Sequence, residues 1–262
     1  MSSQQHQSDS RVLDRRSLWR DHRILPELLS PGMAVLDVGC GTGAITKDIA
    51  DTVSPNGIVV GVDRDRGLLE RARVHCVSRP NLRFEEVDAT SLDYEARFDV
   101  VTAARTLQWI ADPEIALRQM TRAAKPGGLV VVLDYNHALN AWTPAPPPAF
   151  ARFYSMFLSW RESNGWDNEM ANHCPALFAA VGLPEIRTYV QDEATAKGDV
   201  DFDEKTALWI EVIEKIGPAL EGAGVCDAAL LDAARQSYDA WRRTALLRHT
   251  LSMRSTVAKR RT

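Results

Sequence analysis

The sequence predicts an α/β fold built on a doubly wound, mostly parallel sheet. Between residues 33 and 134, short apolar runs alternate with helices that have one polar face, as in consecutive βαβ units. The first apolar run ends in an acid and then in three glycines spaced two apart, which is typical of a strand that stops at a tight turn. Loops that follow such strands meet at one edge of a parallel sheet, where these folds bind nucleotides.

Each element of this core is predicted by its own local pattern. Strands are expected where apolar runs are bounded by turn residues, at 34–38, 58–62, 82–87, 98–103 and 129–134. Helices with one apolar face are expected between them, at 43–52, 65–77 and 113–123, and ahead of them at 11–29.

The alternation of strands and helices breaks after Asp134. Four prolines lie between residues 135 and 148, which predicts a loop. Further helices are expected at 149–163, 171–181, 202–220 and 227–245, with strands at 186–191 and 246–257. The predicted organisation is a tail and helix (1–29), a core (30–135), a lid insertion (136–169), a core continuation (170–198), a helical insertion (199–245), and a last strand with a basic tail (246–262). Insertions next to a binding edge usually select the substrate and exclude water.

The glycine loop is compatible with two kinds of ligand. Gly39, Gly41 and Ala44 fit the G-x-G-x-x-A dinucleotide fingerprint, which leaves an NAD-dependent oxidoreductase open. Asp37 favours a different ligand, because a carboxylate just before the loop would repel a pyrophosphate at the helix N-terminus. S-adenosyl-L-methionine (SAM) carries a sulfonium, an ammonium group and no phosphate, and would suit this loop. Asp37 could instead simply order the loop or cap the helix.

Together with later motifs, the chain resembles the Rossmann-like (class I) SAM-dependent methyltransferases of the small-molecule type. The matching segments occur in the family's order, at Val35–Gly43, Ile58–Asp63, Phe84–Ala89, Phe98–Val101 and Lys125–Gly128. The resemblance covers roughly residues 30–135. It implies a seven-stranded sheet whose last strand is antiparallel, with helical lid insertions.

The resemblance also implies SAM as the cofactor and assigns roles around it. An acid at the place of Asp63 accepts both ribose hydroxyls, and one at the place of Asp88 accepts from the adenine amino group. The residues expected at the cofactor are Asp37, Gly39, Cys40, Gly41, Gly43, Asp63, Arg64, Asp88, Ala89 and Arg105. Simpler interpretations stay open, since Asp63 could cap the following helix and Asp88 could be an ordinary turn residue.

Methyl transfer requires positioning and, for an acceptor of high pKa, a base. His137 follows the fifth predicted strand and is the candidate base, although a surface-loop histidine would look the same. The residues expected in the substrate pocket are His22, Gln108, Trp109, Tyr135, Trp160 and Trp166. Such an aromatic lid suits a flat or apolar small molecule, but helices also use aromatic residues for packing. The run Leu107–Pro113 is similar to the trans-aconitate branch of the family.

The composition of the chain indicates which kinds of partner to expect and in which compartment the protein works. A net charge of −4 and a pI near 5.9 argue against a general nucleic-acid binder. The four cysteines form no C-x-x-C pair, so no metal site is expected, and no segment reads as a membrane span or an export signal. We therefore expect a cytoplasmic SAM-dependent methyltransferase acting on a small molecule, a secondary metabolite or a carboxylic acid. A homodimer is left open, as are an NAD-dependent oxidoreductase and a non-catalytic SAM-binding protein.

Overall fold

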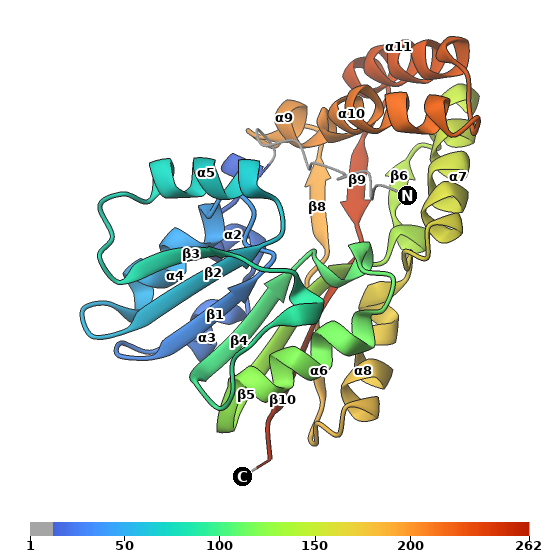
Figure 1. The fold of residues 1–262 in the computed structure, drawn as a ribbon. Coiled ribbons are helices and arrows are strands. Elements are labelled where there is room, and N and C mark those ends of the chain that lie inside the picture. Colours follow the sequence, from blue (N-terminus) through green and yellow to red (C-terminus); the bar gives the residue numbers. More distant parts are fainter. Residues whose placement is uncertain (1–12, 262) are drawn as a thin grey trace. The chain divides into compact units, whose positions relative to one another are not determined.

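The computed structural model describes residues 13–261, and the chain divides into two units (Figure 1). The first unit joins the chain up to Tyr135 with Glu169–Gln191 and the segment from Met253 onward. The second unit consists of Asn136–Asn168 and Asp192–Ser252. It takes in residues 192–198 and 246–252, which the sequence analysis places with the core. The expected N-terminal tail and the start of the expected helix at 11–29 lie outside the described residues.

The first unit is built on a seven-stranded sheet with the order β3-β2-β1-β4-β5-β10-β7. Its strands are β1 (Ala34–Val38), β2 (Ile58–Asp63), β3 (Leu82–Glu86), β4 (Phe98–Ala104), β5 (Ala124–Tyr135), β7 (Arg187–Val190) and β10 (Met253–Lys259). Strands β1 to β5 pair in parallel, and β10 runs antiparallel to both β5 and β7. The predicted fold class is thereby confirmed. The order reverses between β1 and β4, and such a switch point is where these sheets bind ligands.

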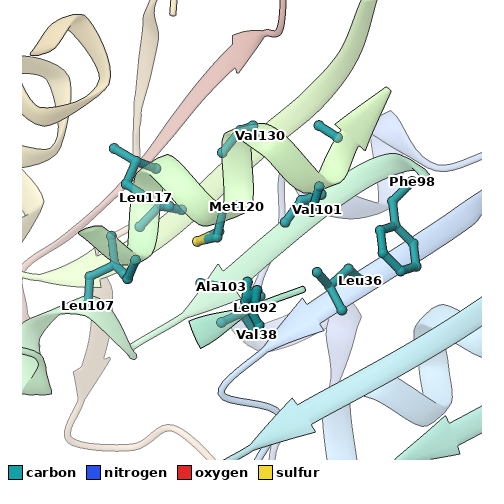
Figure 2. Close-up of a cluster of buried hydrophobic side chains, with 14 of the residues drawn as sticks. Leu36, Val38, Leu92, Phe98, Val101, Ala103, Leu107, Leu117, Met120 and Val130 are labelled. Atoms are coloured by element: carbon teal, nitrogen blue, oxygen red, sulfur yellow. The ribbon is translucent and has the colours of Figure 1, made fainter. Parts of the chain in front are cut away.

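Helices pack on both faces of this sheet. On one face lie α6 (Pro113–Ala123) and α8 (Met170–Ala180), and Figure 2 shows Leu117 and Met120 of α6 over strand residues such as Val101. The other face is covered by α4 (Ala44–Val53), whose buried side chains pack on the alternate residues of the same strands. Full burial of each large apolar side chain contributes roughly 1.5–3 kcal/mol, so these two clusters fix the strands that carry the loops.

Acidic caps set where two helices of the first unit begin. The Asp65 carboxylate accepts from the Leu68 amide at 3.1 Å and starts α5 (Arg66–His75), which packs on β2 and β3. Asp112 accepts from the Ile115 amide at the start of α6. Two short 3-10 helices follow the third and fourth strands, η1 (Ala89–Ser91) and η2 (Leu107–Trp109). The helix cap at α5 is therefore Asp65, and the interpretation of Asp63 as that cap is wrong.

The expected helix at 11–29 is not continuous. Its described part contains α2 (Leu18–Asp21) and α3 (Leu25–Leu28), separated by His22, whose φ of −147° is not helical. Pro26 fits the first turn of α3, where no intrahelical amide hydrogen bond is needed, whereas inside a longer helix it would cost one such bond. The apolar spacing indicated the buried face correctly, since Leu18 and Leu25 are fully buried, but not the break.

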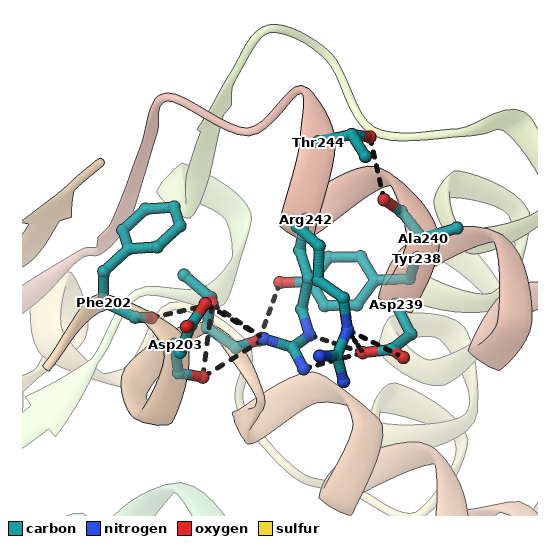
Figure 3. A network of polar contacts seen from close by, with 9 residues as sticks. Phe202, Asp203, Tyr238, Asp239, Ala240, Arg242 and Thr244 are labelled. Carbon is teal, nitrogen blue, oxygen red and sulfur yellow. Dashed lines mark hydrogen bonds and ion pairs between the residues drawn. The ribbon is translucent and has the colours of Figure 1, made fainter. Parts of the chain in front are cut away.

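The second unit combines a three-stranded sheet, in the order β6-β9-β8, with four α-helices and one 3-10 helix in its described residues. Its elements are η3 (His137–Leu139), β6 (Ala141–Thr143), α7 (Pro148–Ser163), β8 (Glu193–Ala196), α9 (Phe202–Thr206), α10 (Leu208–Gly222), α11 (Ala228–Thr244) and β9 (Arg248–Leu251). Figure 3 shows how α11 is tied to α9. The buried Arg242 guanidinium lies 2.7 Å from a carboxylate oxygen of Asp239 and donates to the Asp203 carbonyl at 3.2 Å. No helix in the described part of the chain has the length and apolarity needed to cross a membrane.

Three sequence expectations for these segments were wrong. The single strand at 246–257 is two strands, because β9 pairs with β6 and β8 while β10 joins the large sheet. The loop at 135–148 contains β6, a strand too short to show an alternating pattern. The helix at 202–220 is two helices, and the second continues through Pro218 to Gly222.

Candidate functional site

The loop after β1 is held in a conformation that only glycine adopts without strain. Gly39, Gly41 and Gly43 have φ values of +72°, +56° and +74°. The Gly39 amide donates to the Val62 carbonyl at 2.8 Å, which fixes the loop to the end of β2. A Cβ atom at Gly39 would lie 2.3 Å from Oγ1 of Thr106, in the loop after β4. The loops after β1 and β4 are therefore in close contact.

A small pocket opens beside this loop. Its walls include Asp37, the stretch 39–42 and Ala104 at the end of β4. The Thr42 hydroxyl is buried there without a hydrogen-bond partner among residues 13–261, so a polar group that a ligand can satisfy faces a confined space. Burial and the carboxylates of Asp37 and Asp63 raise the pKa of Cys40 well above its ordinary value, so this thiol stays protonated.

Asp37 is a buried carboxyl group that is only partly compensated. Thr46 Oγ1 donates to its Oδ2 at 2.6 Å, so the carboxylate does order the start of α4. Burial raises the pKa of Asp37 to about 6, with the Thr46 hydrogen bond acting against this and nearby Asp63 acting with it. A cationic group in the pocket would stabilise the ionised form, which is the chemistry expected of an acid that meets an ammonium or sulfonium.

Asp63 connects the glycine loop after β1 to the loop after β2, and a ribose would lie between these loops. Its Oδ2 accepts from the Gly41 amide and its Oδ1 accepts from the Asp65 amide, each at 2.9 Å. Burial raises the pKa of Asp63, and the two amide hydrogen bonds oppose that shift. Each carboxylate oxygen has a second lone pair, so both ribose hydroxyls can still be accepted. Recognition of the ribose by Asp63 remains a prediction, now attached to a group that also fixes the glycine loop.

We expect Asp63→Ala to weaken SAM binding by about 2–4 kcal/mol, because it removes charged hydrogen bonds and releases the Gly41 amide. Isothermal titration calorimetry measures the loss. Asp65→Ala is the matched control, since it removes a neighbouring carboxylate that only caps α5 and should leave affinity unchanged. Equal affinities for wild type and Asp63→Ala, with both folded, would remove Asp63 from the cofactor site.

Asp88 and Arg64 form a second, more exposed group at the ends of β2 and β3. Asp88 Oδ1 accepts from the amide and the hydroxyl of Thr90, at 2.9 and 2.7 Å, and starts η1 at Ala89. Arg64 lies 3.9 Å from the other carboxylate oxygen. Partial burial acts to raise the pKa of Asp88, but the Thr90 hydrogen bonds and the Arg64 charge outweigh it and lower the pKa. The turn role of Asp88 is confirmed, and its contact with adenine remains a prediction.

Arg105 interacts with two of the residues expected in the substrate pocket, Tyr135 and His22. Its Nε donates to the Tyr135 hydroxyl oxygen at 3.0 Å. His22 is fully buried, and its Nε2 lies 3.2 Å from Oγ1 of Thr102. Burial, followed by the charge of Arg105, lowers the pKa of His22 to about 3, so the imidazole is neutral at physiological pH. Arg105 was expected at the cofactor, and its contact with SAM remains a prediction.

Gln108 and Trp109 lie in η2, directly after β4. The Gln108 amide donates to Oδ2 of Asp134 at 3.1 Å, and its side chain is buried. Asp134, fully buried at the end of β5, therefore fixes the turn that carries both residues. Trp109 is half-buried in the same turn.

The other three predicted site residues lie in the second unit. Trp160 and Trp166 are in edge-to-face contact, with ring centroids 5.4 Å apart. His137 is only 7% exposed and its ring meets Phe157 edge-to-face at 6.2 Å. Burial, and then the charge of Arg161, lowers the pKa of His137 well below its ordinary value. His137 is therefore a neutral, buried imidazole rather than a surface-loop histidine.

Sequence reasoning missed several residues that shape these groups. Arg161 is fully buried and donates from Nε to Oδ1 of Asn168 at 2.8 Å. An arginine beside Trp160 on an amphipathic helix gives no signal that it points inward. Thr46 gave no signal either. It lies nine residues after Asp37, in the first turn of α4, and only the placement of that helix shows that its hydroxyl reaches the carboxylate. Of these three residues, Asp134 is the one whose role the sequence could have indicated, because it is an acid that ends an apolar strand at the binding edge.

Comparison with known proteins bears on this arrangement. A family model described as "Methyltransferase domain" matches residues 29–192. The demethylmenaquinone methyltransferases of Staphylococcus aureus strains JH9 and Newman are each 32% identical over 150 residues. That match covers 56% of this chain and 58% of theirs, so it spans little more than half the length of these relatives.

Solved structures with the same fold are more distant in sequence. A phosphoethanolamine N-methyltransferase 2 from Haemonchus contortus, in complex with S-adenosylhomocysteine, is 19% identical with a TM-score of 0.58, covering 92% of this chain and 52% of that one. The YcgJ protein from Bacillus subtilis is 16% identical with a TM-score of 0.59, covering 91% and 97%. The [4+2]-cyclase SpnF is 20% identical with a TM-score of 0.57, covering 95% and 85%. The family match, the strand order and the acidic glycine loop agree, and the chain belongs to the methyltransferase-domain family, the Rossmann-like class I SAM-dependent methyltransferases.

Proposed function

We propose that this protein transfers the methyl group of SAM to a small-molecule acceptor. The observation that carries the proposal is the pocket beside the glycine loop, where Asp37 lies in the wall and Asp63 binds the Gly41 amide. Two carboxylates at this place suit a cationic ligand without phosphate. The methyl of SAM is attached to a sulfonium, a good leaving group, so the protein mainly has to bind, orient and exclude water.

For the acceptor, we propose a flat small molecule that carries an oxygen function. The curated relatives are named for methylation of demethylmenaquinone, and the aromatic residues after β5 would suit such a ring. A carboxylic acid or a secondary metabolite of this kind also fits the similarity of Leu107–Pro113 to the trans-aconitate branch. The SpnF cyclase has the same fold, so the reaction has to be tested directly and not inferred from the fold.

His137 remains the proposed base. Because its pKa lies well below the ordinary value, the imidazole is unprotonated throughout the physiological range and has a lone pair for a proton, but it is a weaker base than an exposed histidine. We expect His137→Ala to lower kcat by roughly 10²–10⁴-fold while SAM affinity stays intact. We also expect no change in wild-type activity from titration of this group above pH 6.5. Full kcat in the variant, with unfolding temperatures measured for both proteins, would make His137 a packing residue.

The proposal is tested by a screen with SAM labelled on its methyl group. The panel contains a short-chain demethylmenaquinol, phosphoethanolamine, trans-aconitate and simple phenols, and product formation is measured by extraction of the label. We expect transfer to at least one oxygen-bearing ring compound, and Asp63→Ala is the inactive control. SAM binding without transfer to any member of the panel would favour a non-catalytic SAM-binding protein.

A further inference from the structure

Two residues from ahead of β1 complete the wall of the pocket beside the glycine loop. Leu13 and Arg16 line it together with Asp37 and Thr42. A Cβ atom at Gly41 would lie 3.3 Å from Cδ1 of Leu13, so the N-terminal segment, residues 13–16, lies directly against the glycine loop. The family model begins at residue 29, so this part of the wall lies outside the matched region.

Contacts with two helices hold the N-terminal segment at the pocket. The Asp14 carboxylate pairs with the Arg71 guanidinium of α5. Two residues after the segment, the Leu18 amide donates to Oδ2 of Asp48 in α4 at 2.9 Å, and the Leu18 side chain is fully buried. The segment that carries Arg16 is therefore anchored to the helices that follow β1 and β2.

Thr42 supplies a polar group that lacks a partner in the described part of the chain. Its side chain is only 1% exposed, and its hydroxyl makes no hydrogen bond within residues 13–261. A hydroxyl has one hydrogen to donate and two lone pairs. A buried hydroxyl without a partner costs free energy that a bound ligand recovers. Because Thr42 lines the pocket, a polar group of a ligand there would satisfy it.

The pocket wall carries two opposite charges, the carboxylate of Asp37 and the guanidinium of Arg16. An α-amino-acid group has an ammonium and a carboxylate on one carbon atom, so it complements both charges, whereas a phosphate complements only Arg16. A guanidinium has five N–H groups and can hold a ligand carboxylate in addition to its contacts with the protein. The Thr42 hydroxyl can donate to the same carboxylate. The pocket therefore matches the methionine part of SAM and not its nucleoside.

We propose that Arg16 and Thr42 bind the carboxylate of the methionine part of SAM, with the ammonium group at Asp37. The inference rests on the proposed function and deepens it, because it divides the cofactor site into subsites. It assigns a specificity role to a segment outside the family match. The protein selects SAM over decarboxylated SAM, which carries the same sulfonium, nucleoside and ammonium group.

The test compares SAM with decarboxylated SAM, two ligands that differ by one carboxylate. Calorimetric titration measures the affinity of the protein for each. We expect wild type to bind SAM about 100-fold more tightly, as for charge-assisted hydrogen bonds in a confined pocket. Arg16→Gln and Thr42→Val should each reduce this preference at least about fivefold through weaker SAM binding. Both variants should bind decarboxylated SAM within twofold of wild type.

Three control variants separate the carboxylate contact from other effects. Arg20→Gln removes an exposed arginine of α2 that pairs with Asp21, and it should keep the wild-type preference. Thr42→Ser retains the hydroxyl and should also keep it. Asp37→Asn should weaken the binding of both ligands equally, because both carry the ammonium group.

Wild-type protein that binds SAM and decarboxylated SAM within twofold of each other would overturn the inference alone. The same conclusion would follow if Arg16→Gln and Thr42→Val kept the wild-type preference, or if they lost affinity for both ligands equally, which marks a merely structural effect. Wild-type protein that binds neither SAM nor S-adenosylhomocysteine (SAH) would overturn the proposed function and the inference with it.

Discussion

Gly39→Ala is expected to abolish measurable SAM binding and to destabilise the first unit by about 2–4 kcal/mol. The new Cβ would lie 2.3 Å from Thr106 Oγ1, and φ at this residue is +72°. Thr106 has little freedom to move, because its hydroxyl contacts the Val38 and Ala104 carbonyls at 3.3 and 3.2 Å. The loops after β1 and β4 would have to separate, and the pocket between them would be lost.

Gly32→Ala separates crowding from backbone strain. Gly32 has a φ of +89°, and a Cβ there would have no neighbour within 4 Å. The control therefore has the left-handed strain, roughly 1 kcal/mol, without the clash. Calorimetry and thermal unfolding of both variants check the prediction. If Gly39→Ala binds SAM as tightly as Gly32→Ala does, the glycine loop is not the cofactor site.

Asp37→Asn is expected to stabilise the protein without cofactor and to weaken SAM binding. The folded pKa of Asp37 is about 6, against an ordinary value of 3.8, so between these pH values the folded state binds the proton more tightly. Stability therefore falls as pH rises from about 4 to about 6, and the shift of about two pH units corresponds to roughly 3 kcal/mol lost above pH 6. Asparagine removes this loss while it can still accept from Thr46.

The cofactor has the opposite preference, because a cationic ligand favours the ionised carboxylate. Wild-type affinity for SAM should rise as pH increases through about 6, and the variant should bind SAM roughly 10–100-fold more weakly without that rise. Asp99→Asn is the matched control. Burial acts to raise the pKa of Asp99, but Lys125 and the Ala34 amide lower it, so the variant should lose stability and keep its affinity. A destabilised Asp37→Asn with wild-type affinity would contradict this account of Asp37.

The core of the fold could be predicted because its signals are local. Strand β1 has the predicted bounds, 34–38, since it is a mostly apolar, largely buried run that ends at the glycine loop. The helix at Pro113–Ala123 also has the predicted bounds, because Asp112 and Pro113 mark its start unambiguously. The candidate cofactor loop was predictable for the same reason.

The elements and site properties that the sequence did not predict depend on contacts between segments that are distant in the chain. Strand β6 has three residues and exists because it pairs with β9, more than a hundred residues later. The burial of His22 and His137, and hence their low pKa values, follows from tertiary packing that no spacing reveals. The left-handed Arg105 is a further example, because its sequence neighbours predict an ordinary strand end.

The central claim is that the acidic glycine loop binds SAM and not a pyrophosphate-bearing dinucleotide. The most direct measurement is thermal unfolding of the wild-type protein with saturating SAM, SAH or NAD, with calorimetric titration of each ligand. A ligand that binds only the folded state raises the unfolding temperature. The account predicts an increase with SAM and with SAH, binding to one site, and no change with NAD. An increase with NAD alone would contradict it and favour the oxidoreductase interpretation of Gly39, Gly41 and Ala44.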